Sequence, residues 1–306
     1  MDNNVTWKLA AHQQFKDLVT KLDTVFRSAS SDQPRMLRLV GVSGVGKSVL
    51  LKEYARLRPP QELEDGWRIP VLYTSLPAHP TEKTLLAGML RALGDPEPTY
   101  GTATQQRLRL LKGLAATGTQ LLIVDEVQHF VKQMYKSTRI ADAADTFKTL
   151  TNEYRGGLVL SGAPSSRILF QLNSQLRSRM PCEIRLRPFR WDDDTSRSMF
   201  LAVLKRQFPL GFENDDYLLT ADAAHRVWYA TDGVLRAMSQ FVRALQDLAP
   251  FEKALSRDLL GEAFRAAIWA EPPAPRDPFG EQFTWTRLNL PGEPYAIDPK
   301  EGDNHA

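Results

Sequence analysis

Met36–Ser48 reads MLRLVGVSGVGKS, a short apolar run followed by a glycine-rich loop that ends in lysine and serine. The apolar run predicts a buried strand, and the residues after Ser48 favour a helix, which is the strand–loop–helix order of a phosphate-binding loop. In such a loop successive backbone N–H groups point toward an anion that lies at the N-terminus of the helix. The G-x4-G-K-S spacing therefore predicts a P-loop at Gly41–Ser48 that binds the phosphates of a nucleotide.

The residues of this loop have separate predicted tasks. Lys47 is expected against the β- and γ-phosphates, and the Ser48 hydroxyl is expected to hold Mg²⁺. A glycine-rich turn that carries a lysine by chance is the structural alternative, and the flanking strand and helix disfavour it. The residues expected to surround the nucleotide are Gly41, Val42, Ser43, Gly44, Val45, Gly46, Lys47, Ser48 and Val49.

Composition limits the class of protein. The chain has 306 residues, of which 42% are hydrophobic and 25% charged, a profile typical of a soluble globular protein with one large or two modest domains. No apolar run reaches the roughly 18 residues of a membrane span, and the polar N-terminus lacks a signal-peptide pattern. We therefore expect a cytoplasmic protein without a membrane partner.

Cysteine and histidine give no sign of a disulfide or a metal site. The single cysteine, Cys182, excludes an internal disulfide, and its apolar surroundings at Pro181–Ile184 predict a buried strand thiol. The five histidines lack metal-ligand spacing, so no structural zinc is expected.

Charge is unevenly distributed along the chain. The net charge is +3, but residues 271–306 carry seven acidic and three basic side chains, which leaves the rest of the chain at +7. A basic body is compatible with nucleic-acid binding, although many soluble enzymes are equally basic.

Apolar runs alternate with helical patterns up to Pro188, which predicts a parallel sheet covered on both faces. We expect residues 1–34 to form a helical segment that packs on the core, and residues 35–188 to form the α/β nucleotide-binding domain. The predicted strands lie at 36–40, 68–76, 120–124, 157–160 and 182–186, with helices after the P-loop and at about 81–93, 105–116 and 141–154.

The pattern beyond Pro188 is purely helical, at 192–207, 218–230, 234–248 and 252–269, and predicts a small all-α domain over residues 189–270. Residues 271–306 hold seven of the 20 prolines and no sustained periodicity, so we expect an extended, acidic tail. Its apolar residues suggest two alternatives, docking on the protein's own body or capture of a partner.

Two carboxylates end the run Gln120–Glu126. In P-loop ATPases an acid at this place holds Mg²⁺ opposite the P-loop hydroxyl, and Asp125 fits that role. Glu126 is then the predicted general base that polarises the attacking water. Two solvated carboxylates at a strand end are the structural alternative, which the preceding apolar residues disfavour.

Hydrolysis also needs positive charge near the γ-phosphate. Arg179 is the first candidate and Arg177 the second, because both precede the last strand, where oligomeric ATPases present an arginine to the neighbouring subunit. An ordinary surface salt bridge is the alternative for each. Arg236, near the start of a helix after Gly233, is expected to reach the phosphates from the helical domain.

These motifs together resemble an AAA+ ATPase with a helical lid, and more narrowly the TniB/TnsC transposition ATPases, which are related to MuB-type target selectors. The resemblance covers about residues 10–250. It rests on the P-loop, the two carboxylates and four further segments, namely Leu158–Pro164, Arg177–Arg179, Pro188–Trp191 and Gly233–Arg236.

The resemblance implies a homo-oligomer, a ring or filament, that assembles with ATP on duplex DNA and recruits a transposase and a target-selection protein. It also implies backbone contacts to DNA, without sequence preference, between the second strand and Asp125. Solvated helix faces are the alternative for each DNA candidate. The candidates are Lys83, Arg91 and Thr102, with a second patch at Lys132, Lys136 and Arg139.

The chain departs from the family pattern at one position. The strand after the second acid often ends in a threonine or asparagine that senses the γ-phosphate, whereas this chain has Ala163, and Ser161 is the nearest hydroxyl. Nucleotide sensing and the hydrolysis rate are therefore in question.

Two other classes of function remain open from the sequence. One is a replication initiator or helicase loader of the same ATPase type, which a DNA-reading module after the helical domain would favour. The other is a signalling ATPase whose nucleotide state controls protein partners without DNA, and salt-dependent duplex binding would disfavour it.

Overall fold

The computed structural model describes residues 13–78, 80–131, 137–207, 214–248 and 254–296, with the backbone alone at 30, 137–143 and 215. The chain forms two compact units. The first holds Gln14–Ser43 and Lys47–Leu186, and the second is formed mainly by the chain from Arg187 onward. Within the described ranges no helix is both long and apolar enough to cross a membrane.

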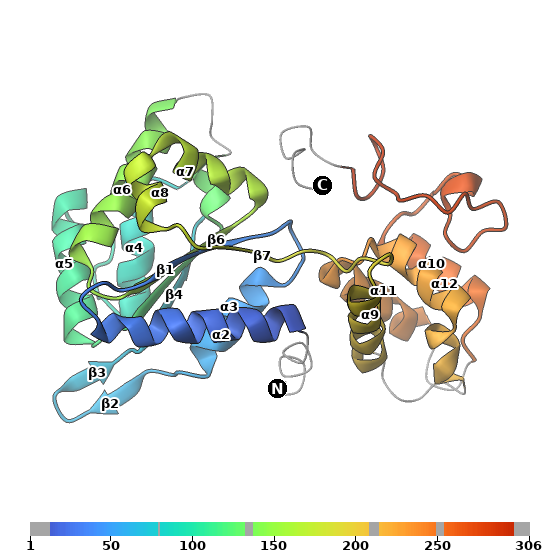
Figure 1. Cartoon of the computed structure of the whole chain (residues 1–306), viewed down its shortest axis with the longest axis horizontal. Helices are drawn as coiled ribbons and strands as arrows, with labels where there is room; N and C mark the ends of the chain where they lie inside the picture. The colour runs from blue at the N-terminus through green and yellow to red at the C-terminus, as the bar shows by residue number, and fades with distance from the viewer. Residues whose placement is uncertain (1–12, 79, 132–136, 208–213, 249–253, 297–306) are drawn as a thin grey trace. The chain divides into compact units, whose positions relative to one another are not determined.

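The first unit is built on a five-stranded parallel sheet, which confirms the predicted α/β class (Figure 1). In order across the sheet the strands are β4 (Val71–Ser75), β5 (Leu121–Asp125), β6 (Gly157–Gly162), β1 (Met36–Val40) and β7 (Glu183–Arg185). Val40 pairs with Gly162, and Ser75 pairs with Asp125. All strands run in one direction, so the P-loop after β1 and Glu126 after β5 lie at the same edge of the sheet.

Helices cover both faces of this sheet (Figure 1). On one face an apolar core joins β4, β5 and β6 to five helices, α4 (Glu82–Leu93), α5 (Ala103–Ala116), α6 (Ser137–Glu153), α7 (Ile168–Leu172) and α8 (Ser174–Arg179). The other face carries α2 (Gln13–Arg27) and α3 (Lys47–Arg56). Every residue of β5 and β6 is buried, as expected for strands enclosed between two helical layers.

Helix α2 is fixed to the end of α3 by a small polar cluster. The Tyr54 hydroxyl donates to Asp23 over 2.8 Å, and Arg58 forms an ion pair with the same carboxylate at 2.6 Å. Phe15, Leu18 and Leu22 recur at helical spacing on α2 and are buried. The N-terminal helix is therefore part of the first unit's core.

Two details differ from the sequence-based expectation. The predicted strand 68–76 is divided, because Pro70 has no N–H to donate to a ladder. Residues before it form a two-stranded antiparallel hairpin, β2 (Gln61–Leu63) and β3 (Gly66–Arg68), and β4 starts at Val71. The prediction of a buried thiol was wrong: Cys182 is exposed, since it precedes the short edge strand β7 instead of lying within a central strand.

The second unit consists of four main helices, α9 (Asp194–Gln207), α10 (Ala221–Thr231), α11 (Leu235–Leu248) and α12 (Arg257–Ala267). Their apolar faces meet around Phe200, Phe241 and Phe264, which are fully buried. The hydroxyls of Thr220 and Ser256 accept from backbone N–H groups in the first turns of α10 and α12 and so define where these helices begin.

Residues 271–296 pack against these helices without long elements of their own. Phe279, Phe283 and Leu288 are buried, and Phe279 stacks on Phe241 with ring centroids 5.9 Å apart. Arg226 of α10 donates to the Pro278 carbonyl over 2.6 Å. Of the two alternatives for the tail, docking on the protein's own body therefore describes this segment.

Candidate nucleotide-binding site

The P-loop connects the buried strand β1 to helix α3. Gly44 and Gly46 have φ angles of +85° and +99°, which side-chain-bearing residues rarely adopt, so the loop requires glycine at both positions. Helix α3 begins at Lys47, directly after the loop. The first backbone N–H groups of a helix have no partner within it, and the helix dipole favours negative charge there. The loop therefore ends in a backbone site suited to a phosphate.

Lys47 adds a positive charge to this site. Its side chain is 6% exposed, and its ammonium donates to the carbonyls of Gly41 at 2.6 Å and Val42 at 3.0 Å. These bonds hold the ammonium within the turn of the loop, next to the N-terminus of α3. The loop and the lysine thus combine two features that attract an anion.

Asp125 lies at the same edge of the sheet, two strands away from β1. Adjacent strands are about 4.8 Å apart, so the ends of β1 and β5 are separated by about 10 Å, with β6 between them. Asp125 is fully buried and accepts from the Tyr73 hydroxyl at 3.0 Å and from the Glu126 N–H at 2.9 Å. Burial raises the pKa of Tyr73, and the charge of Asp125 raises it further, so the phenol remains a donor to the carboxylate.

Glu126 turns the chain away from the sheet. Its backbone is left-handed, with φ 61° and ψ 33°, a conformation that costs a non-glycine residue about 1 kcal/mol or more. Its side chain is 34% exposed, and its Oε2 lies 3.8 Å from Nε2 of His129. Asp125 is therefore enclosed by protein, whereas the Glu126 side chain is partly accessible to water.

Gln128 is a site residue that the sequence reasoning missed. It is 6% exposed, its Nε2 donates to Oε2 of Glu126, and its Oε1 accepts from the Ala163 N–H at 2.9 Å. A polar side chain thus contacts the backbone at position 163. A polar residue two positions after Glu126, within an otherwise mostly apolar stretch, is the signal in the sequence that could have indicated it.

Ser161, the nearest hydroxyl in the sequence, is fully buried within β6. It alternates with Leu160 and Gly162 along β6, so it points to the opposite face of the sheet from Gly162. Its hydroxyl is buried without a hydrogen-bond partner among the described residues.

Comparison with known proteins identifies the family. A family model described as "Bacterial TniB protein" matches residues 6–190. The chain belongs to the TniB family. The matched region is more than half of the chain and contains the P-loop, Asp125, Glu126 and Gln128. No curated protein sequence matches the chain.

Solved structures show the same AAA+ fold. The ORC1 protein of Aeropyrum pernix in complex with DNA superimposes with a TM-score of 0.58 at 18% identity, over 81% of this chain and 64% of that one. Cdc6p from Pyrobaculum aerophilum gives 0.57 at 15% identity, over 82% and 66%, and the A. pernix ORC2 protein gives 0.56 at 16%, over 81% and 66%. The chain thus spans slightly less than two thirds of the length of these proteins.

The two candidate arginines, Arg177 and Arg179, lie on α8. Leu176 and Met180 are fully buried and anchor this short helix in the core, and the Asn173 side chain caps it by accepting from the Leu176 N–H at 2.9 Å. Arg177 and Arg179 lie between the two anchors and are exposed. Exposure makes them accessible to another molecule, while their catalytic role stays a prediction. Arg236 is an exposed residue of α11 in the second unit, and its predicted contact with phosphates also stays a prediction.

The residues predicted to contact DNA have different structural settings. Lys83 and Arg91 are exposed on α4. Thr102 has a structural role, because its hydroxyl accepts from the Gln105 N–H at 3.3 Å while its own N–H donates to the Gln105 side chain at 2.8 Å, which forms the capping box of α5. Lys132 and Lys136, like the side chain of Arg139, lie outside the described residues.

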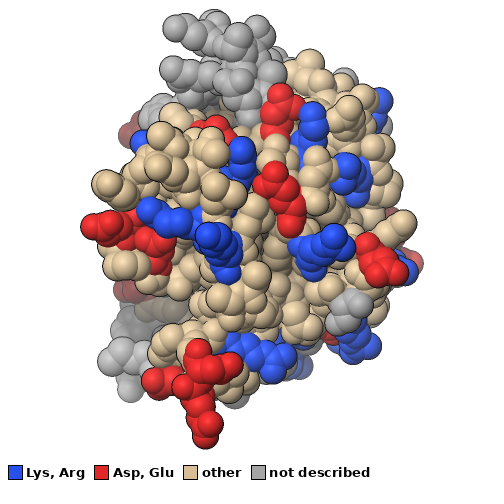
Figure 2. All heavy atoms as spheres, turned by 90° about the vertical axis from the view of Figure 1, so that its left-hand side faces the viewer, with Lys and Arg blue, Asp and Glu red and all other residues tan. Residues whose placement is uncertain are grey.

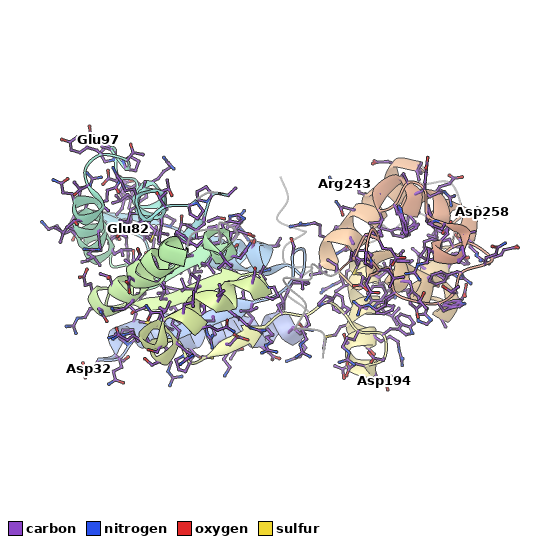
Figure 3. All side chains as sticks on the ribbon, turned by 90° about the horizontal axis from the view of Figure 1, so that it is seen from above. Asp32, Glu82, Glu97, Asp194, Arg243 and Asp258 are labelled. Atoms are coloured by element: carbon purple, nitrogen blue, oxygen red, sulfur yellow. The ribbon has the colours of Figure 1, made fainter. Side chains whose placement is uncertain are left out.

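Charge at the α5 end of the first unit is mixed. Figure 2 shows acidic and basic side chains interspersed on this face. Arg107 pairs with Glu82 at 3.5 Å, and Arg109 pairs with Asp95 at 3.2 Å. Glu97, whose carbonyl also accepts from Arg109, adds a further acid at this end (Figure 3). Acidic side chains thus offset part of the positive charge around the α4 and α5 candidates.

Proposed function

We propose that this TniB-family chain is an ATP-dependent regulator of DNA transposition. In this proposal it oligomerises on duplex DNA in its ATP state, selects the target and recruits the transposase, and hydrolysis promotes disassembly. The proposal rests on one observation. The P-loop with its buried Lys47 lies at the same edge of the sheet as Asp125 and Glu126. Membership of the TniB family supports the link to transposition.

The residues fit Mg²⁺ together with a nucleoside triphosphate. Mg²⁺ favours hard oxygen ligands and retains several waters or phosphate oxygens, so two protein oxygens are sufficient. The Ser48 hydroxyl and the Asp125 carboxylate would hold the ion, and Asp125 keeps acceptor capacity beyond its two hydrogen bonds. When bound, the ion would supply positive charge that stabilises the phosphates.

Glu126 and the cations have distinct roles in the proposed hydrolysis. The Glu126 carboxylate accepts a proton from the attacking water, and the Lys47 ammonium stabilises charge on the γ-phosphate oxygens. Arg179, or Arg177, of an adjacent subunit supplies further positive charge in the transition state. The proposal therefore requires an oligomer for full activity. Both arginines are exposed on α8, which makes them accessible to a neighbouring subunit.

Duplex DNA is the proposed surface for assembly. The A. pernix ORC1 structure with DNA supports DNA as a ligand compatible with this fold. Lys83 and Arg91 are the described candidates for phosphate contacts, which would be sequence-nonspecific and weaken steeply with salt.

The experiment that tests the proposal is electron microscopy of the protein with duplex DNA and a non-hydrolysable ATP analogue. We expect rings or filaments that require both ligands. Lys47→Ala should abolish them, whereas Lys16→Ala, which removes an exposed lysine of α2, should not. A protein that remains monomeric with both ligands would contradict the proposal.

Replication initiation or helicase loading is the second candidate, favoured by the likeness to ORC1 and Cdc6p. That function calls for a DNA-reading module beyond the helical domain. Residues 271–296 instead pack on the helices as an extended segment. A nucleotide-gated signalling ATPase is the third candidate, and salt-dependent binding to duplex DNA would exclude it.

A further inference from the structure

The side chain of Gln128 links the ends of β5 and β6. The residue follows β5 in a 3-10 turn, Val127–Phe130, and reaches the backbone of Ala163 directly after β6. Its amide thus connects the residue after one strand to the carboxylate after the other.

The hydrogen bonds fix which way the amide points. Because the Ala163 N–H is a donor, the atom facing it at 2.9 Å must be the carbonyl oxygen Oε1. The NH₂ group then faces Oε2 of Glu126, which is an acceptor. Both ends of the amide are matched, and rotating the amide by 180° would place donor against donor and acceptor against acceptor.

Gly162 provides the space for this arrangement. A Cβ atom at position 162 would lie 2.8 Å from Oε1 of Gln128 and 2.9 Å from Cγ2 of Val127, closer than such atoms normally approach. The glycine at the end of β6 therefore lets the amide pack against the strand. Burial makes the geometry stringent, since an unmatched polar group costs about 1–3 kcal/mol there.

We propose that Gln128 is a positioning residue for the general base. It holds Oε2 of Glu126 toward the end of β6, which leaves Oε1 to accept the proton from water. In this way Gln128 provides the polar link at the strand end that Ala163 lacks. The inference rests on the proposed ATPase function and adds a specific residue to it.

Two substitutions distinguish the contribution of the bond to Glu126 from that of the bond to Ala163. Gln128→Glu keeps an acceptor for the Ala163 N–H but replaces the donor to Glu126 with a carboxylate oxygen. Gln128→Met keeps the approximate shape and removes both bonds. Gln106→Met is the matched control, because Gln106, like Gln128, is a buried glutamine, and it donates to the Pro98 carbonyl at 2.9 Å, outside the proposed site.

Steady-state ATP hydrolysis with duplex DNA, together with the affinity for a fluorescent ATP analogue, gives the decisive measurements. We expect both Gln128 variants to lower kcat about tenfold to a hundredfold, the usual effect of misplacing a catalytic group, while analogue affinity changes less than about threefold. Gln106→Met should leave kcat unchanged. A residue needed only for folding would instead reduce analogue affinity and stability along with kcat.

The outcomes distinguish this inference from the proposed function. If Glu126→Gln abolishes turnover and both Gln128 variants retain it within about threefold, the positioning role is overturned and the ATPase proposal stands. If Glu126→Gln retains wild-type turnover, the general-base assignment is wrong and the positioning role fails with it. Absence of turnover in the wild-type protein with DNA would overturn both proposals.

Discussion

Arg287 and Asp232 form a double hydrogen bond that joins the tail to the turn between α10 and α11. Nε of Arg287 donates to Oδ1 of Asp232 at 2.7 Å, and Nη2 donates to Oδ2 at 2.6 Å. Asp232 is left-handed, with φ 49°, and directly follows α10. Tyr295, further along the tail, donates to the Ala230 carbonyl at 2.7 Å. The tail thus stabilises the turn that leads into the helix carrying Arg236.

Arg287→Ala should loosen both the tail and this turn. The Asp232 side chain is only 8% exposed, so losing its partner leaves a largely buried carboxylate and costs about 1–3 kcal/mol locally. Hydrogen exchange should become faster at residues 279–295 and at 230–236. Arg243→Ala is the control, because Arg243 is exposed on α11 (Figure 3). Equal exchange in the two variants would show that the ion pair does not hold the tail.

Two leucines of the tail offer a test of how much its burial stabilises the helical unit. Leu288 is fully buried, whereas Leu290 is 56% exposed. Leu288→Ala should lower the free energy of unfolding by about 2–4 kcal/mol through lost burial and a residual cavity, and Leu290→Ala by less than about 0.5 kcal/mol. Urea denaturation followed by tryptophan fluorescence measures both, and similar losses would contradict the described packing.

Motifs with fixed local spacing were predictable from the sequence, while contacts between distant segments were not. The P-loop is determined by eight consecutive residues, and Asp125 by the apolar run before it. The bond from Gln128 to Ala163 spans 35 residues, so only the folded sheet brings the two together. The same reason explains why the sequence could not decide between docking of the tail and partner capture, since Asp232, the partner of Arg287, lies 55 residues back along the chain.

Thr102 and Cys182 show a second limit of the sequence. A threonine before a helix suits both a cap and a phosphate contact, and the hydrogen bonds of Thr102 identify the cap. Cys182 was expected to be buried because its neighbours are apolar, but exposure depends on whether a strand is central or at an edge. Neither distinction is encoded in a short window of residues.

Tyr73→Phe should weaken the proposed Mg²⁺ site without removing a ligand. The substitution deletes the 3.0 Å hydrogen bond to Asp125 and leaves the ring in place. Removing a group that orients a metal ligand typically weakens metal affinity about tenfold to a hundredfold. The Mg²⁺ concentration for half-maximal ATPase activity should therefore rise about tenfold. Tyr154→Phe is the control, since it deletes a comparable bond to the Thr119 carbonyl before β5 starts. An unchanged Mg²⁺ requirement would remove Tyr73 from the site.

Glu183 should make stability depend on pH. Burial favours a higher pKa for Glu183, but hydrogen bonds from Arg167 and Arg185 outweigh it and hold the pKa below the ordinary 4.5. The lowered pKa means that the stabilisation is complete at neutral pH and is lost as the pH falls from about 4.5 through the folded-state value. The difference in unfolding free energy between wild type and Glu183→Gln should therefore be constant near neutral pH and shrink below pH 4.5. Glu64→Gln, an exposed residue between β2 and β3, should show no such trend.

Mixing two inactive variants can show whether Arg179 acts on a neighbouring subunit. Arg179→Ala should lower turnover about a thousandfold if the arginine stabilises the transition state, whereas Arg155→Ala, which removes an exposed arginine before β6, should not. Glu126→Gln should also be inactive. In a mixed oligomer, an Arg179→Ala subunit provides an intact Glu126, and the adjacent Glu126→Gln subunit provides the arginine.

Equal mixtures of these two variants should therefore recover activity that neither has alone. With random assembly about a quarter of the head-to-tail interfaces pair an intact Glu126 with an intact arginine, so turnover should approach about a quarter of the wild-type value. Repeating the mixture with Arg177→Ala determines which arginine of α8 is responsible. Recovered activity would be diagnostic, because an arginine that acts within its own subunit cannot complement a defective Glu126 in another subunit. If no mixture recovers activity while the subunits still assemble, neither arginine completes a neighbour's site.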